Sequence, residues 1–251
     1  MTPFPFSKSP VIVLPQSPPY FVSNFGYWEE DISYESAGLK FLSKFVFGAG
    51  LQPKSKILEL GSGLGGSLVY WSKNFQPKLL SAINLPGEQS EFAEQLFIST
   101  KTEVKPFIHG SWESIKSLAD SSYQYVFSLD ASYHFQNLAL FYRESYRVLE
   151  PGGRFVFTNF QITESRFKKL WWLYLPFLIP KNNLKLVEET ITELKAIGFK
   201  EIKHENWTKP VLFGFIEFSK TLPASLKAFA KVLNLFAKNL GLSYHYYVFE
   251  K

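Results

Sequence analysis

Lys56-Ile57-Leu58-Glu59-Leu60-Gly61-Ser62-Gly63-Leu64-Gly65-Gly66 is the stretch of sequence that decides the predicted fold. Its first five residues form a short apolar run that is typical of a buried strand. Glycines follow at once, and they allow positive φ and a close approach of a ligand to the backbone. The helix predicted next offers free N–H groups and a positive dipole end at its N-terminus. The stretch therefore predicts a strand, a ligand-binding loop and a helix.

Strands and helices alternate on both sides of this loop. Apolar residues at helical spacing predict a helix over 34–47, before the first strand. The predicted strands are 56–60, 79–85, 105–109, 123–129, 154–160, 199–207 and 244–249, and the predicted helices after the loop are 64–75, 87–98, 114–119, 137–149, 164–175, 184–197 and 222–240. This order predicts a parallel sheet with right-handed crossovers.

The pattern changes after the fifth predicted strand, and this change sets the domain organisation. Residues 1–33 form an N-terminal extension and lid, since residues 1–20 hold six prolines. Residues 34–251 form one domain, because the sheet resumes after residue 198. We expect a helical cap inserted at about 161–198.

Bulk composition excludes several classes of protein. The chain of 251 residues has no cysteine, which excludes disulfides, thiolate nucleophiles and Cys-ligated zinc, and no His/Asp/Glu cluster has metal-ligand spacing. Its net charge of +5 comes from scattered lysines, so we expect no nucleic-acid partner. No apolar run reaches the ~20 residues needed to span a bilayer, and no signal peptide is apparent. We therefore expect a cytoplasmic protein without a metal.

The glycine loop fits two kinds of cofactor. Gly61, Gly63 and Gly66 match the dinucleotide pattern G-x-G-x-x-G. The same loop with Glu59 and Gly65 matches E-x-G-x-G-x-G. A carboxylate at the strand end repels a pyrophosphate but favours a positively charged ligand. The next predicted strand also ends without the acid that grips a dinucleotide ribose, so the sequence favours the second pattern.

Five further segments fall in the same order as in a known family: Phe25–Trp28, Ser81–Gln89, Gly110–Glu113, Leu129–Phe135 and Arg147–Gly153. With E-x-G-x-G-x-G they resemble the class I S-adenosylmethionine-dependent methyltransferases. The most similar group is the small-molecule one of cyclopropane/mycolic-acid, sterol and coclaurine N-methyltransferases. The resemblance covers roughly residues 20–160. It implies a doubly wound, mostly parallel, seven-stranded α/β sheet of Rossmann-like type with a helical cap.

The resemblance also implies S-adenosyl-L-methionine as the cofactor and assigns residues to it. By resemblance, Asn84 and Gln89 bind the ribose hydroxyls, Leu85 packs on adenine, and Ser111 and Trp112 bracket the adenine. Tyr27 belongs to an aromatic lid over the methionine part. The predicted cofactor residues are Tyr27, Glu59, Gly61, Gly63, Gly65, Asn84, Leu85, Gln89, Ser111, Trp112 and Leu129.

Two candidate catalytic residues follow the fourth predicted strand. His134 lies where ligands bind in open α/β sheets, and an imidazole suits a general base; the alternative is a histidine at a helix start that packs under the cofactor loop or bonds to the backbone. Tyr133 replaces the Glu that the group often has, and it either orients a substrate or packs in the lid. Asp130 is either a substrate contact or a helix N-cap.

The predicted function is methyl transfer to a small, fairly hydrophobic acceptor at O, C or N. The alternatives are a non-catalytic S-adenosylmethionine-binding or lipid-interacting protein and, less favoured, an NAD(P)-dependent oxidoreductase. The apolar segment 168–179 either roofs a substrate pocket, forms a homodimer face or touches a membrane peripherally. For the helix 222–240, packing on the sheet is favoured.

Overall fold

The computed structural model describes residues 18–29 and 33–251. The helices are α1 (Tyr34–Ala49), α2 (Gly66–Phe75), α3 (Glu88–Thr100), α4 (Leu138–Val148), α5 (Val187–Ile197), α6 (Gly214–Phe218) and α7 (Ala224–Asn239). The strands are β1 (Lys56–Leu60), β2 (Leu79–Asn84), β3 (Phe107–His109), β4 (Tyr123–Ser128), β5 (Leu149–Ile162), β6 (Lys200–Asn206) and β7 (Leu242–Glu250). Short 3₁₀ or π turns are η2 (Trp112–Ser117), η3 (Ser132–His134), η4 (Ser165–Phe177), η5 (Lys181–Asn183), η6 (Thr208–Phe213) and η7 (Ser219–Thr221).

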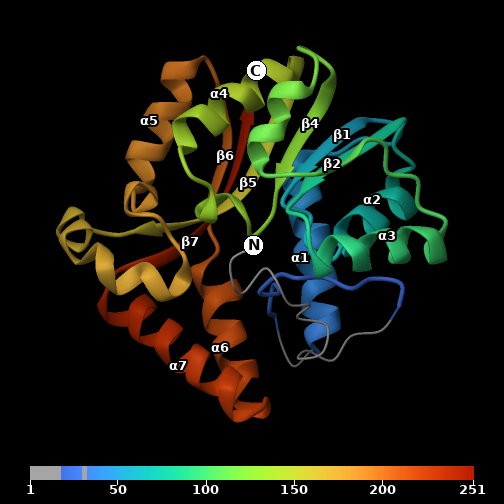
Figure 1. Ribbon diagram of the computed structural model, residues 1–251. Coiled ribbons are helices and arrows are strands. Elements are labelled where there is room, and N and C mark those ends of the chain that lie inside the picture. Colours follow the sequence, from blue (N-terminus) through green and yellow to red (C-terminus); the bar gives the residue numbers. More distant parts are fainter. Residues whose placement is uncertain (1–17, 30–32) are drawn as a thin grey trace.

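The seven strands form one sheet in the order β3-β2-β1-β4-β5-β7-β6 (Figure 1). Strands β1 to β5 pair in parallel, whereas β7 is antiparallel to both of its neighbours. The order reverses between β1 and β4, so their crossover helices leave on opposite faces. Such a switch point opens a crevice at the carboxyl ends of the strands. The predicted seven-stranded, doubly wound fold is therefore confirmed.

Helices cover both faces of the sheet and enclose two apolar cores. One core gathers side chains from α1, α2, α3 and the cap, and the other gathers those from α4, α5 and η2. Side chains of β1 alternate between the faces: Ile57 joins the first core, while Leu58 and Leu60 join the second. This alternation directs Glu59 to the side of α2, where it has polar partners.

The boundary predicted for the fifth strand is wrong. The predicted helix ends at residue 149 and the predicted strand begins only at residue 154, but β5 begins at Leu149. Gly152 N–H donates to Lys251 O (2.9 Å), and Lys251 N–H donates to Gly153 O (2.9 Å). The backbone of Lys251 thus pairs with both glycines, although Gly152 has a left-handed φ of 76°.

The cap differs from its predicted extent. Helix α5 was counted within it, yet α5 packs against α4 and β6 and covers the sheet. Helix α7 was expected on the sheet, yet it packs on α6, η6 and the end of β7, and Figure 1 shows it beyond the strand ends. The segment η4, predicted as a helix over 164–175, is a kinked 3₁₀ helix. In the parts of the chain that are described, no helix combines the length and apolarity needed to cross a membrane.

Candidate active site

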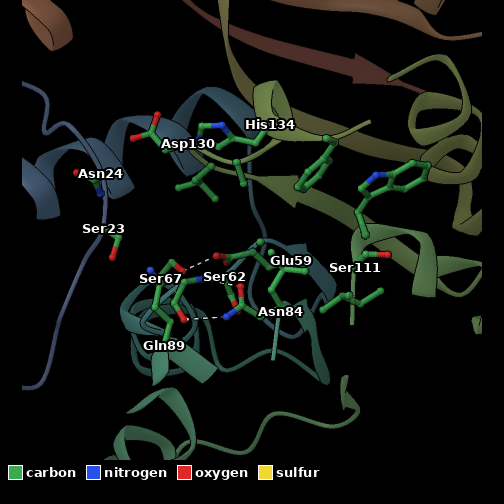
Figure 2. Close-up of a pocket in the computed structure, with 18 of the residues that line it drawn as sticks. Ser23, Asn24, Glu59, Ser62, Ser67, Asn84, Gln89, Ser111, Asp130 and His134 are labelled. Atoms are coloured by element: carbon green, nitrogen blue, oxygen red, sulfur yellow. Dashed lines mark hydrogen bonds between the residues drawn. The ribbon is translucent and has the colours of Figure 1, made fainter. Parts of the chain in front are cut away.

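A cleft of about 400 Å³ opens at the switch point between β1 and β4. This volume lies within the range of ~300–1,000 Å³ usual for small-molecule sites. Figure 2 shows Glu59, Ser67, Asn84 and Gln89 on one side and Asp130 and His134 on the other. Ser23 and Asn24, from the segment before α1, close one flank. The cleft therefore combines the loop after β1 with residues that follow β4.

The glycine loop follows β1 with three left-handed glycines. Gly61, Gly63 and Gly65 have φ of 77°, 55° and 79°, a region that other residues enter only with strain. Gly61 and Gly63 line the cleft. Gly66 lines it too, and a Cβ at Gly66 would meet the Phe21 carbonyl oxygen at 2.1 Å. The loop is thus pressed between the cleft and the N-terminal segment.

Glu59 lies at the base of the cleft and is almost fully buried. Ser67 Oγ donates to Glu59 Oε1 (2.5 Å), and Trp71 Nε1–H donates to Oε2 (2.6 Å). Burial raises the pKa of Glu59 from 4.5 to about 7, although the two hydrogen bonds act in the opposite direction. A positive group placed in the cleft would favour the ionised form of Glu59, so Glu59 is suited to pair with a cationic ligand.

Asn84 braces the glycine loop while it lines the cleft. Its Oδ1 accepts from Gly63 N–H (3.1 Å), and its Nδ2 donates to Gly63 O (3.2 Å) and Ser90 Oγ (2.9 Å). Gln89, in the first turn of α3, also lines the cleft. The amide of Asn84 therefore orders the loop, and Gln89 is the second amide at this end.

An apolar slot extends from these amides. It is lined by Ile83, Leu85, Ser111, Trp112, Leu129, Ala131 and Phe135. Trp112 is buried and stacks on Phe135 at 6.1 Å between ring centroids. A flat apolar slot beside two amides suits a ring that carries a polar substituent. The predicted residues Leu85, Ser111, Trp112 and Leu129 all lie there.

His134 lines the opposite side of the cleft at the end of η3. Its Nδ1 lies 3.1 Å from Leu178 O. Burial lowers the pKa of His134 from 6.5 to about 4, so the ring is neutral at pH 7. Because a carbonyl only accepts, Nδ1 carries the proton and Nε2 is the basic nitrogen. His134 thus has the protonation state that a general base requires.

Asp130 joins three separate segments beside His134. Its Oδ2 accepts from Phe25 N–H (3.1 Å), and its Oδ1 accepts from Tyr244 O–H. Its backbone N–H donates to Thr158 Oγ1 (3.0 Å), and its φ is 47°. Burial raises the pKa of Asp130 from 3.8 to about 7. Asp130 is not the helix N-cap considered from the sequence; it ties the N-terminal segment to the sheet.

The part of the chain that carries most of the cleft matches a known protein family. Residues 58–157 match the family described as "Methyltransferase domain". This match covers 100 of the 251 residues, about two fifths of the chain, and includes the glycine loop and the residues that follow β4. The predicted family is therefore confirmed, and S-adenosylmethionine is the methyl donor of such domains.

Known proteins similar to the chain share this methyltransferase domain or its fold. "Phosphoethanolamine N-methyltransferase 3" of Arabidopsis thaliana is 26% identical over 198 residues, which cover 78% of this chain and 38% of that protein. Geranyl diphosphate C-methyltransferase from Streptomyces coelicolor has a TM-score of 0.77 at 12% identity, covering 94% of this chain and 93% of its own. The [4+2]-cyclase SpnF has a TM-score of 0.72 at 18% identity, covering 93% and 89%. The chain spans between about a quarter and two fifths of the length of the first curated relatives it matches.

Three predicted site residues of the methyltransferase domain lie away from the cleft. Tyr27 packs edge-on against Trp207 (5.1 Å), because its N–H donates to Ala37 O and holds it against α1. Tyr133 is buried in the core, 4.7 Å from the ring of Phe160, so it is not placed as a catalytic residue. Gly65 faces α3, where a Cβ would meet Phe97 at 2.6 Å. Gly65 thus allows α2 and α3 to pack closely. Of these two neighbouring glycines, only Gly66 lines the cleft.

Several cleft residues were not predicted. The N-terminal segment reaches the cleft through Val22, Ser23 and Asn24, upstream of the aromatic lid expected at residues 25–28. Ser62 lines the cleft, and its buried Oγ has no hydrogen-bond partner among the residues that the structure describes. Ser67 was missed although it lies eight positions after Glu59, in the first turn of α2. Over residues 18–29 and 33–251, no group of three or more His, Cys, Asp or Glu is arranged to hold a metal ion.

Proposed function

We propose that the protein transfers the methyl group of S-adenosylmethionine to a small, fairly hydrophobic acceptor at O, N or C. The observation that carries this proposal is the position of His134. A neutral imidazole with a basic Nε2 lines the same cleft as the glycine loop and lies across it from Glu59. A donor site and a proton acceptor thus share one cavity, as methyl transfer to a protonated nucleophile requires.

The residues at the donor end fit a nucleoside that carries a positive charge. Glu59 supplies the countercharge, and the apolar slot around Trp112 suits an adenine ring. Gln89 and Asn84 are the amides closest to where ribose hydroxyls would lie. The buried Ser62 Oγ, without a described partner, is a polar atom that a ligand in the loop would satisfy. S-adenosylmethionine supplies an electrophilic methyl group when it is bound.

The acceptor end is formed by Asn24, Leu42, Asp130 and His134. His134 Nε2 takes the proton that an oxygen or nitrogen nucleophile releases, while Leu178 O holds the ring in place through Nδ1–H. Asp130 fixes the N-terminal segment over this end and thereby limits the access of water. Because its pKa is low, His134 is deprotonated at pH 7 but is a weak base. Alignment of the acceptor with the methyl group therefore has to contribute part of the rate enhancement.

The names of related proteins support a small-molecule acceptor and span three kinds of attacking atom. They include a phosphoethanolamine N-methyltransferase, a fatty-acid O-methyltransferase and sterol 24-C-methyltransferases. The apolar lining of the cleft favours an acceptor with a hydrophobic part. The homodimer and the peripheral membrane contact expected from the sequence would both use one surface of the cap.

The test begins with calorimetry using S-adenosylhomocysteine and NADH as separate ligands. We expect S-adenosylhomocysteine to bind and NADH not to bind, since Glu59 repels a pyrophosphate. Tight binding of NADH alone would refute the proposal. A turnover assay with phenols, terpenoids, amines and fatty acids then identifies the acceptor class. Binding of S-adenosylhomocysteine without turnover of any of these would favour the non-catalytic alternative.

A further inference from the structure

The cap carries most of the exposed large apolar side chains of the described chain. Six of the ten lie on η4, its C-terminal end and α7: Trp172, Leu175, Leu178, Phe229, Val232 and Leu235. We call these six residues the cap face. The buried ring of Phe177 joins the two segments, because it contacts Phe229 (5.9 Å) and Phe236 (4.8 Å). The two segments that carry the cap face therefore pack against each other.

Helix α7 presents a buried face, an apolar row and a lysine row around its axis. Its buried face includes Ala230, Leu233 and Phe236, which pack on the protein. At about 100° per residue, Phe229, Val232 and Leu235 form an apolar row that begins at Phe229, between Leu233 and Phe236 on the buried face, and turns away from that face. The three lysines of α7 (Lys227, Lys231, Lys238) lie within about 40° of one another in the lysine row, centred about 120° from the apolar row. An apolar row beside a lysine row is typical of a helix that lies in a membrane interface.

Positive charge is concentrated at this surface. The two segments 165–177 and 224–239 contain six lysines and arginines and no Asp or Glu. Arg166 pairs with Glu164 and Lys168 with Glu189, both outside these segments. The other four cations, Lys169, Lys227, Lys231 and Lys238, form no ion pair within residues 18–29 and 33–251. The rest of the chain has 21 Lys and Arg (27 less these six) against 22 Asp and Glu, so the net positive charge of the chain comes from these two segments.

The charge pattern selects among possible occupants. A two-fold dimer through the cap face would bring the lysine row of α7 close to its own copy, and no acid of either segment would offset the repulsion. An anionic lipid surface complements both rows of α7. Its headgroups neutralise the lysines, and its acyl chains accommodate the apolar side chains. Trp172, 55% exposed, is the residue type that anchors at such interfaces. We propose that the cap face is a docking surface for anionic lipid membranes.

The cap face also adjoins the acceptor end of the cleft. Leu178 belongs to it, and the carbonyl of the same residue accepts from His134 Nδ1–H at 3.1 Å. Figure 1 shows α7 and the neighbouring gold segment η4 beyond the strand ends, the edge of the sheet at which the cleft opens. Docking therefore brings the cleft beside the lipid headgroups. This inference concerns binding and stands apart from the proposed methyl transfer.

Sedimentation with vesicles tests the docking surface. The probes are vesicles of phosphatidylcholine alone and of phosphatidylcholine mixed with phosphatidylglycerol. We expect binding to the mixed vesicles that weakens as NaCl is raised, and little binding to the neutral ones. The triple variant Lys227→Gln/Lys231→Gln/Lys238→Gln should weaken binding roughly a hundredfold. The double variant Val232→Ser/Leu235→Ser should weaken it about tenfold or more, because both side chains are exposed and would enter the acyl boundary.

Matched controls remove the same groups elsewhere. Lys73→Gln/Lys78→Gln/Lys200→Gln removes three exposed lysines far from the cap, and Ile98→Ser removes an apolar side chain that is 79% exposed on α3. Both controls should bind mixed vesicles within about twofold of the parent, because neither set lies on the cap face. Thermal melts and S-adenosylhomocysteine calorimetry verify that every variant is folded.

Three outcomes would overturn the proposal. One is no binding to mixed vesicles by the folded parent. Another is an equal loss in the control lysine triple, which would make the attraction a property of net charge. The third is a homodimer in analytical ultracentrifugation that Val232→Ser/Leu235→Ser dissociates, which would make the cap face a subunit interface. Cofactor affinity is measured separately, so none of these outcomes bears on the proposed methyl transfer.

Discussion

The two ends of the cleft are built in different ways. At the donor end, the hydrogen bonds join residues close in sequence or on neighbouring strands: Glu59 to Ser67 and Trp71, and Asn84 to Gly63 and Ser90. At the acceptor end, the bonds join distant segments. Asp130 accepts from residues 105 and 114 positions away, and His134 contacts a carbonyl 44 positions away.

This difference teaches where a site can vary. The donor end depends on a strand, a turn and a helix start, so it can form wherever that local pattern folds. The acceptor end depends on how the N-terminal segment, β7 and the cap pack together. Changes in the cap can therefore alter the acceptor while the donor end stays intact, which agrees with the varied acceptors in the names of the related proteins.

The largest expected effect belongs to the acceptor end. His134→Ala should lower kcat by about 10²- to 10⁴-fold, because the proton acceptor is lost. Its affinity for S-adenosylhomocysteine, measured by calorimetry, should stay within about threefold of the parent, because His134 lies across the cleft from the donor residues. Burial lowers the pKa of His134 to about 4, so its base form persists, and it should cause no loss of kcat between pH 8 and pH 6.

His109 provides the control for this prediction. It is an exposed histidine at the end of β3 that contacts Glu94 at 3.2 Å, away from the acceptor end. His109→Ala should keep kcat within about twofold, as is usual for surface substitutions. If His134→Ala turns over the best acceptor at the parent rate, His134 is not the base, and the two ends of the cleft do not divide donor binding from proton transfer.

The next largest effect compares two glycines of the donor end. Gly66→Ala places a Cβ against the Phe21 carbonyl and should displace the N-terminal segment, with a loss of S-adenosylhomocysteine affinity of about 100-fold. Gly63→Ala meets only ordinary contacts at 3.6 Å, from Gln89 and Ser23. Its cost is the left-handed φ of 55°, about 1–2 kcal/mol or roughly tenfold in affinity. Calorimetry that gave the opposite order would mean that the ligand contacts Gly63 more closely than the N-terminal segment contacts Gly66.

Sequence reasoning located the donor end well, for a physical reason. Glycines at positive φ, a strand end and a helix start leave a local signature, so residues 56–66 predicted the cleft without any distant contact. The same signature did not distinguish Gly65 from Gly66. Gly65 faces α3 and Gly66 lines the cleft, and which of the two does so depends on how the helices pack. The boundary of β5 was missed for a similar reason, since its glycines form hydrogen bonds with Lys251, which is distant in the sequence.

The acceptor end was only partly predictable. His134 was found because it follows β4, a position fixed by the topology of parallel sheets. Tyr27 and Tyr133 were assigned to the site because they are aromatic residues near it. An aromatic side chain packs equally well in a core or in a lid, and in the structure both residues pack in or against the core. Ser23 and Asn24 carry no local signal; they reach the cleft because Asp130 holds the neighbouring Phe25 N–H.

The smallest predicted effect tests the electrostatic role of Glu59. Burial raises the pKa of Glu59 to about 7, so at pH 6 about a tenth of the carboxyl is ionised. If the ionised form binds the ligand ammonium, affinity for S-adenosylhomocysteine should rise up to about tenfold from pH 6 to pH 8, with proton release on binding. Glu59→Gln keeps an acceptor for Trp71 but cannot ionise, so its affinity should be lower at pH 8 and flat across this range. Calorimetry in buffers of different ionisation enthalpy measures both quantities.

The unliganded protein should respond to pH in the opposite direction. Because the folded Glu59 retains a proton that the unfolded chain releases above pH 4.5, stability should fall as pH rises from about 4.5 to 7 and level off beyond. Asp130, whose pKa is also raised to about 7, adds to the same slope. Glu59→Gln should remove part of this slope in thermal melts, and bound ligand should also remove the part due to Glu59, because the bound form holds Glu59 ionised. If the affinities of the parent and Glu59→Gln change with pH in parallel, the buried carboxylate only orders Ser67 and Trp71. The preference for a cationic over an anionic nucleoside would then have to come from other residues.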